Sequence, residues 1–159
     1  FIIKIDPKFS GYEILYGGKL NETIYPPVYR NGALFFMGET FEEPEKIYRL
    51  DISTKKVTAI FSADKVPDFS DWTILGDQIF IRSIKSGDIV TIWACNLDGS
   101  NLRKTAAADM PALSLPAEYN GKVYMVRYFS TDSTAVFYEM NLNGTGFQKA
   151  FARSRYRKF

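Results

Sequence analysis

The feature that most constrains this chain is one segment that occurs three times, about 45 residues apart. The copies start at Ile47, Ile92 and Phe137. Each copy is a run of β-branched or aromatic residues, a polar turn and a second short run, which is typical of a β-hairpin. A period of this length with strand patterns and no helical pattern predicts the blades of a β-propeller, an all-β fold.

A second kind of turn recurs in the same phase of the repeat. Its three copies are Asn31-Gly32, Gly76-Asp77 and Asn120-Gly121. Asn-Gly favours a two-residue hairpin because both of its residues adopt positive φ readily. Two turns that repeat in register predict four-stranded antiparallel blades. We place a half blade at residues 1–18 and blades at residues 24–62, 70–106 and 112–152. The first strand of the blade at 24–62 is expected to be short or edge-like, because Pro26 and Pro27 have no N–H to donate. In the blade at 112–152 we predict a first strand over Ala112–Tyr119 and a polar loop at Ser130–Thr134.

The composition fits one propeller region that spans residues 1–159. Hydrophobic residues make up 46% and aromatic residues 16%, which favours strands and excludes a disordered chain. The net charge of +2 is too small to predict binding to nucleic acid, and no apolar run is long enough to span a membrane. A propeller ring needs at least four blades, so we expect the remaining blades to come from a longer chain or a second copy.

Two residue types limit the chemistry available to the chain. Histidine is absent, which excludes histidine-based acid–base catalysis, a Ser-His-Asp triad and histidine-ligated metal within these residues. Cys95 is the single cysteine, so the chain has no internal disulfide. It lies in a predicted central strand, where we expect a buried and unreactive thiol.

The repeated turns resemble those of a known group of propellers. Asn96–Asn101 and Asn141–Thr145 are similar to the N-L-D-G-S/T turn of TolB-like and YWTD propellers, and most similar to that of DUF5050-type bacterial propellers. The resemblance implies a ring of six to eight blades that is exported to the periplasm or the cell exterior. It also implies a role in binding proteins or sugars.

The candidate ligand-binding residues lie mainly around the predicted start of a first strand, within residues 64–72. Asp64, Asp68, Asp71 and Trp72 lie there, where ligands of propellers commonly bind. Their carboxylates have the chemistry to bind calcium or to hold a sugar beside the indole ring. The alternative is an ordinary loop between blades, whose Asp and Ser side chains cap turns. Tyr25 and Tyr119, in the predicted first strands of the neighbouring blades, complete the candidate set.

We therefore expect a non-catalytic binding or scaffold module for a protein or a glycan, with no cofactor and no metal. One alternative is the propeller portion of a larger hydrolase, peptidase or carbohydrate-active enzyme. Another is a metal-dependent lyase or hydrolase that acts through Asp68 and Asp71. Residues 153–159 carry four basic side chains, and we expect a basic tail or the start of a further strand.

Overall fold

A computed structural model describes residues 1–5, 7–8, 11–18, 22–129 and 134–154 of the chain. These residues form antiparallel β-sheets, and their one helical element is the 3-10 turn η1 (Ala63–Lys65). They contain no helix with the length and hydropathy needed to cross a bilayer. The chain divides into two compact units, Phe1–Lys65 and Val66–Phe159.

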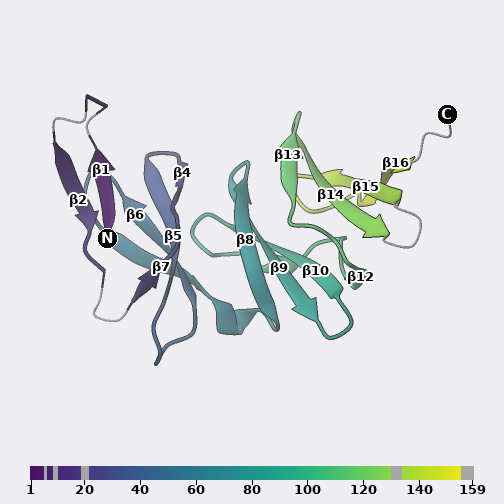
Figure 1. Ribbon diagram of the computed structural model, residues 1–159, viewed down its shortest axis with the longest axis horizontal. Helices are drawn as coiled ribbons and strands as arrows, with labels where there is room; N and C mark the ends of the chain where they lie inside the picture. Colours follow the sequence, from purple (N-terminus) through teal and green to yellow (C-terminus); the bar gives the residue numbers. More distant parts are fainter. Residues whose placement is uncertain (6, 9–10, 19–21, 130–133, 155–159) are drawn as a thin grey trace. The chain divides into compact units, whose positions relative to one another are not determined.

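The first unit contains a hairpin and a five-stranded sheet (Figure 1). The hairpin pairs β1 (Ile2–Ile5) with β2 (Tyr12–Tyr16). The sheet has the order β3-β5-β6-β7, and β4 also pairs with β5. Its strands are β3 (Thr23–Ile24), β4 (Val28–Arg30), β5 (Ala33–Glu39), β6 (Lys46–Asp51) and β7 (Val57–Ser62). One hydrophobic cluster joins the two sheets and contains the buried residues Ile2, Leu15, Phe36, Tyr48 and Leu50.

The edge strand of this sheet is interrupted, as its two prolines predict. Pro26 and Pro27 lie between β3 and β4, and neither residue has an N–H to donate to β5. The backbone N–H of Tyr25 still donates to the carbonyl of Met37 at 2.9 Å. The predicted short strand before Asn31-Gly32 is therefore confirmed as β4.

The second unit contains two further antiparallel sheets. One is five-stranded, with the order β11-β10-β9-β8, and β12 also pairs with β10. The other is four-stranded, with the order β13-β14-β15-β16. The strands of the first are β8 (Phe69–Leu75), β9 (Gln78–Lys85), β10 (Ile89–Asn96), β11 (Arg103–Lys104) and β12 (Met110–Pro111). Those of the second are β13 (Ala117–Tyr119), β14 (Lys122–Phe129), β15 (Thr134–Asn141) and β16 (Gln148–Ser154).

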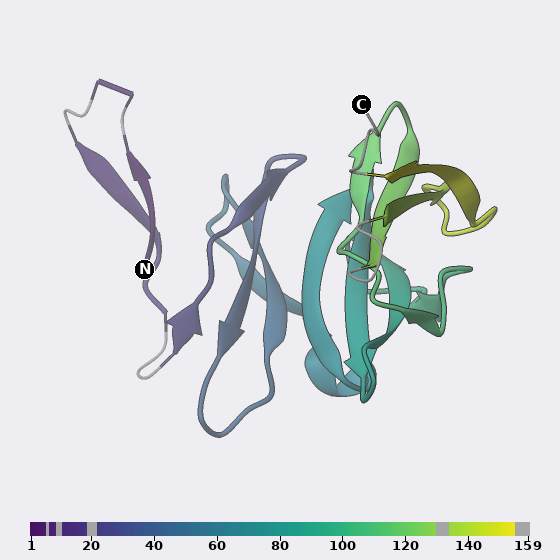
Figure 2. The ribbon, with the colours of Figure 1, turned by 45° about the vertical axis from the view of Figure 1, so that its right-hand side comes forward.

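One hydrophobic core lies between these two sheets. Leu75, Phe80 and Ile92 come from the β8–β11 sheet, while Val123 and Met125 come from β14. Figure 2 shows the two sheets of this unit from a second direction. Cys95 is buried within β10, as the sequence predicts.

The predicted strand over Ala112–Tyr119 is wrong in its first part. Only Ala117–Tyr119 forms β13, and Leu113 makes an isolated bridge with Arg127. Ala112 has a φ of 53°, and Pro116 has no N–H, so a continuous strand cannot form here.

The predicted two-residue turns are confirmed. Asn31 and Gly32 have φ values of 47° and 74°, and Asn120 and Gly121 have values of 49° and 72°. In the third turn Gly76 has a φ of 56°, and Leu75 pairs with Gln78 across it. The three turns join β4 to β5, β8 to β9 and β13 to β14.

Two predicted segments fall partly outside the described residues. Of the polar loop predicted at Ser130–Thr134, residues 130–133 are not described, and neither are residues 155–159 of the predicted tail. β16 extends to Ser154, so the first two residues of the predicted tail belong to this strand.

Candidate functional site

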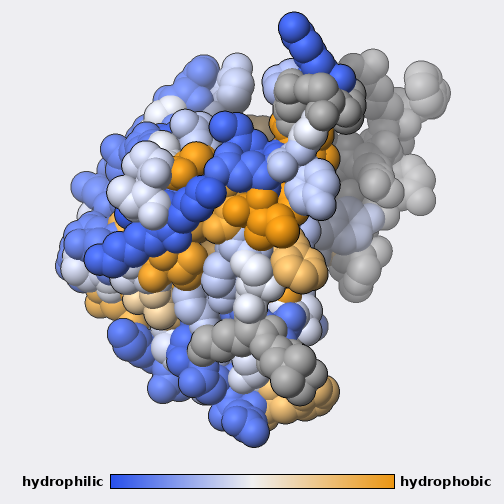
Figure 3. All heavy atoms as spheres, turned by 90° about the vertical axis from the view of Figure 1, so that its left-hand side faces the viewer, coloured by the Kyte–Doolittle hydropathy of each residue, from blue (hydrophilic) through white to orange (hydrophobic). Residues whose placement is uncertain are grey.

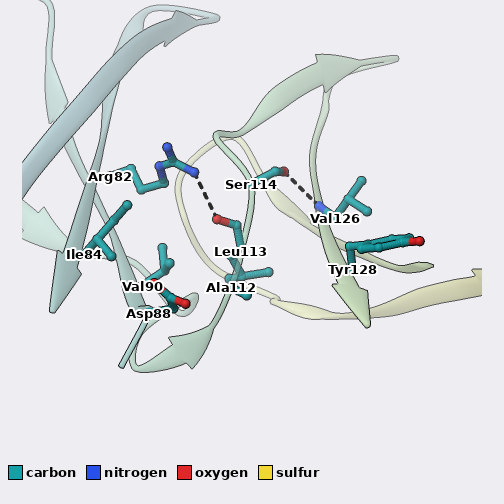
Figure 4. A pocket seen from close by; sticks show the side chains of 9 residues that line it. All are labelled: Arg82, Ile84, Asp88, Val90, Ala112, Leu113, Ser114, Val126 and Tyr128. Atoms are coloured by element: carbon teal, nitrogen blue, oxygen red, sulfur yellow. Dashed lines mark hydrogen bonds between the residues drawn. The ribbon is translucent and has the colours of Figure 1, made fainter. Parts of the chain in front are cut away.

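The second unit has a groove of about 410 Å³ beside the segment that leads into β13. We call it the entrance groove. It lies between strands β9 and β10 on one side and β14 on the other (Figure 4). Its lining consists of Arg82, Ile84, Asp88, Val90, Ala112, Leu113, Ser114, Val126 and Tyr128.

Arg82 joins three parts of this unit at the edge of the groove. Its Nε donates to Oδ1 of Asp71 at 3.0 Å, and its Nη2 donates to Oδ2 at 2.5 Å. Its Nη1 donates to the carbonyl of Leu113 at 3.3 Å. Because Asp71 pairs with Arg82 across β8 and β9, the carboxylate meets the guanidinium in the two-bond geometry that gives strong ion pairs.

Ser114 is also engaged within the protein. Its hydroxyl donates to the carbonyl of Leu115 at 3.0 Å and accepts from the backbone N–H of Val126 at 2.9 Å. The groove therefore offers mainly apolar surface, from Ile84, Val90 and Val126, with the ring of Tyr128 on the same strand as Val126 (Figure 4).

Asp88 contributes a second charged side chain to the groove, next to the β9–β10 turn. It is exposed and has a φ of 59°. Its backbone carbonyl accepts a hydrogen bond from Ala112 at 2.8 Å, which fixes the segment before β13 against this turn.

The structure separates most of the candidate residues predicted from the loop at 64–72. Asp64 lies in η1 of the first unit, whereas Asp68, Asp71 and Trp72 belong to the second. Asp71 faces Arg82, but Trp72 pairs with Ile81 and lies on the opposite face of β8. The indole ring and the Asp71 carboxylate therefore do not form one sugar-binding surface.

Asp68 has a backbone role. Its φ is 55°, and its carbonyl accepts a hydrogen bond from Ile84 at 2.9 Å. Among the residues that the structure describes, no group of three or more Cys, Asp or Glu side chains is arranged to hold a metal ion.

The two predicted tyrosines have different surroundings. The hydroxyl of Tyr25 donates to Oε1 of Glu39 at 2.7 Å, which raises the pKa of the tyrosine. Burial and the nearby Glu39 raise the pKa of Glu45. Tyr119 is 68% exposed, lies beside the Asn120-Gly121 turn and has its ring centroid 6.5 Å from that of Tyr124.

The entrance groove lies mostly outside the residues predicted as a site from the sequence, although the repeat contains a signal for it. Ala112 lies 44 residues after Asp68, and the two residues have φ values of 53° and 55°. Both residues precede the first strand of a sheet and have a left-handed φ. One repeat after the candidate residues 64–72, the chain reaches residues 108–116, three of which line the groove.

Comparison with solved structures identifies the fold. One similar structure is a prolyl endopeptidase, with a TM-score of 0.70 and 12% identity over 95% of this chain. Another is a TolB protein from Agrobacterium tumefaciens, with a TM-score of 0.55 and 18% identity over 77% of this chain. The chain has a β-propeller fold. No family model matches the sequence, and neither does any curated protein.

The propeller segment is short compared with these structures. It spans 23% of the prolyl endopeptidase chain and 46% of the TolB chain. The shared feature is the arrangement of antiparallel sheets. The sequence identities are too low to assign the activity of either protein to this chain.

Proposed function

We propose that this propeller segment is a non-catalytic binding module that recognises a protein, and that the entrance groove accepts an apolar side chain of that protein. The supporting observation is the lining of the groove. Ile84, Val90 and Val126 supply apolar surface, and the polar groups of Arg82 and Ser114 are already bonded within the protein. An apolar side chain can therefore be buried in this groove without breaking these internal hydrogen bonds.

The same lining favours a protein over a glycan. A sugar site needs several polar side chains that are free to hydrogen-bond to the sugar hydroxyls, together with an aromatic ring on which the sugar stacks. Here the guanidinium of Arg82 is held by Asp71 and the carbonyl of Leu113. Asp88 remains as the exposed carboxylate of the groove, and it suits a basic group next to the apolar side chain.

A parallel screen on a peptide array and a glycan array tests this proposal. We expect binding to peptides that place a Leu, Ile or Phe beside Lys or Arg, and several-fold weaker binding by the Tyr128→Ala variant. Tyr29→Ala is the matched control, because Tyr29 is also an exposed tyrosine on a strand but lies in the first unit. Binding to glycans alone, or equal effects of the two variants, would contradict the proposal.

A second candidate is the propeller portion of a larger hydrolase or peptidase. It is supported by the prolyl endopeptidase, whose structure is similar over 95% of this chain, while the chain spans 23% of that enzyme. The test is to determine the complete open reading frame that contains these residues. A hydrolase domain in the same frame would favour this candidate, and a frame without one would dismiss it.

Membership of the DUF5050-type propellers and export to the periplasm or cell exterior are also part of our proposal. Both are supported by the resemblance of the repeated Asn-Leu-Asp/Asn-Gly turns. Fractionation of cells that express the complete protein tests the compartment, and recovery in the cytoplasm would contradict export.

A further inference from the structure

The last sheet of the second unit has an outer face that is rich in aromatic residues. Alternation along the strands places Tyr119, Tyr124, Phe137 and Phe151 on this face. We call it the aromatic face. Tyr119 is 68% exposed and Phe151 is 51% exposed, and the rings of Phe137 and Phe151 stack with centroids 4.3 Å apart. Its two strongly exposed rings make it the kind of surface that marks an interaction site.

The repeat shows what such a face contacts in this fold. Tyr119 and Tyr124 occupy the register positions of Leu75 and Phe80 in the preceding sheet, counted from the Asn120-Gly121 and Gly76-Asp77 turns. By the same register Phe137 corresponds to Ile92, a further member of the preceding sheet's core face. There Leu75, Phe80 and Ile92 are covered by Val123, Met125 and Met140 of the next sheet. The aromatic face is thus equivalent to a surface that another sheet covers.

The first hairpin of the chain also has an exposed apolar face, on the side that does not pack against the sheet after it. Ile2 and Leu15 pack against the five-stranded sheet of the first unit. The other side of the hairpin is its outer face, which consists of Ile3, Ile5, Tyr12 and Ile14. These side chains are between 47% and 72% exposed. Figure 3 looks at the side on which β1 and β2 lie, and shows hydrophobic residues gathered between hydrophilic ones.

We propose that the aromatic face binds the outer face of the first hairpin of a second copy of this chain, so that copies associate head to tail. This contact continues the interfaces already present in the protein. Within each unit, one face of the earlier sheet packs against the sheet that follows it in the chain. The proposed contact is of the same type: the aromatic face of the last sheet in one copy packs against the first hairpin of the other copy. The rings of one copy then lie against the isoleucines of the other.

A second copy suits both faces because each copy has one surface of each kind. Cross-strand pairs Ile3–Ile14 and Ile5–Tyr12 form a compact apolar strip on the hairpin. A two-stranded hairpin with one covered side is only marginally stable, so covering the outer face also stabilises β1 and β2. The association is heterologous and leads either to a closed ring or to a longer assembly.

Light scattering after size exclusion, on the 159-residue chain and two variants, tests the contact. Tyr119→Glu/Phe151→Glu blocks the aromatic face, and Ile5→Lys/Tyr12→Lys blocks the outer face of the hairpin. We expect the unmodified chain to form particles of at least twice 18.1 kDa and each variant alone to remain a monomer. A mixture of the two variants keeps one intact face of each kind and should give a 1:1 dimer.

Each other result overturns the proposal. A monomeric unmodified chain means that the faces do not bind a second copy. A dimer that survives in the Ile5→Lys/Tyr12→Lys variant means that two aromatic faces bind each other. A mixture that stays monomeric, with both variants folded by circular dichroism, excludes the head-to-tail contact. All four substituted side chains are exposed, so we expect the variants to fold.

Discussion

Asp71 is the residue whose role changes most between sequence and structure. In the sequence it is one of several carboxylates around the start of a predicted first strand. In the structure it holds Arg82 through two hydrogen bonds of 2.5 and 3.0 Å. The pair is half-buried, with side-chain exposures of 35% for Asp71 and 22% for Arg82. Arg82 in turn reaches the carbonyl of Leu113, so the pair supports the wall of the entrance groove.

We predict that Asp71→Asn lowers the free energy of unfolding by about 1–2 kcal/mol, because the half-buried guanidinium loses its charged partner. Urea unfolding followed by circular dichroism measures this. Glu43→Gln is the control, since the Lys46–Glu43 pair is at a more exposed position and should change stability by less than about 0.5 kcal/mol. Equal stabilities of the two variants would show that the Asp71–Arg82 pair contributes no more than a surface pair.

The repeated turns provide a prediction on pH. Hydrogen bonds from Ser53 and Thr54 lower the pKa of Asp51, and hydrogen bonds from Ser100 lower the pKa of Asp98. A lowered pKa in the folded state adds stability above the ordinary value of 3.8, and this stability is lost as the pH falls through the folded-state pKa. At the position 45 residues after Asp98, Asn143 accepts the equivalent hydrogen bonds from Thr145, at 3.1 and 2.7 Å, without a charge.

We therefore expect Asp51→Asn/Asp98→Asn to keep its turns and to lose less stability than the unmodified chain between about pH 5 and pH 2. Thermal unfolding across this range measures the difference. Asn143→Asp should have the opposite effect and add acid sensitivity. Parallel pH profiles for all three proteins would show that these carboxylates are not bonded in the folded state.

At the scale of elements, the sequence predicts what local chemistry decides. Asn31-Gly32 and Asn120-Gly121 form the expected turns because their positive φ values are properties of those residues. The prolines before β4 also predict its short length. The strand predicted over Ala112–Tyr119 fails because Ala112 adopts a φ of 53°, which its own side chain does not favour. Its surroundings, including the bond from its N–H to Asp88, impose this geometry.

The candidate site depends on the same kind of long-range contact. The repeat correctly draws attention to the segments that lead into first strands. It cannot indicate that Asp71 is engaged by Arg82, or that Trp72 lies on the other face of β8, without the register of β8 on β9. The groove itself arises where three separate segments meet, so no local pattern encodes it.

Two glycines test how tightly the last sheet is packed on its neighbour. Gly121 has a φ of 72° and open space where a Cβ would lie. Gly144 has a φ of 80°, but a Cβ there would lie 2.9 Å from Cγ2 of Thr105. We predict that Gly121→Ala costs about 1 kcal/mol for backbone strain alone. Gly144→Ala should cost at least about 1 kcal/mol more, because the turn must move away from Thr105.

Differential scanning calorimetry of the two variants measures these losses of stability. For a chain of this length, each kcal/mol lost lowers the melting temperature by about 2–4 °C. The glycines share a sheet and a positive φ, so Gly121→Ala is the matched control for Gly144→Ala. The carbonyl of Gly144 also accepts a hydrogen bond from Ala106 at 2.9 Å, and moving the turn would break it. Equal melting temperatures would mean that the turn yields without disturbing that contact.

At the scale of the whole molecule, the apolar surfaces at the first and last sheets determine how we expect the chain to behave in solution. Burial of apolar surface weakens on cooling and has a negative heat-capacity change. We predict that association of the chain is stronger at about 25 °C than at about 5 °C, and that NaCl up to about 0.5 M does not weaken it. An association that depends on ion pairs would instead weaken as salt screens the charges.

Sedimentation velocity at several concentrations, temperatures and salt levels measures this dependence. Tyr29→Lys is the control, because Tyr29 is an exposed aromatic residue that belongs to neither proposed face, so its replacement should leave association unchanged. Tyr119→Glu should remove association under every condition, because a carboxylate placed among the rings of the aromatic face must lose its hydration when the face is covered. Association that is abolished by salt, or that strengthens on cooling, would show that charged surface and not these two apolar faces joins the copies.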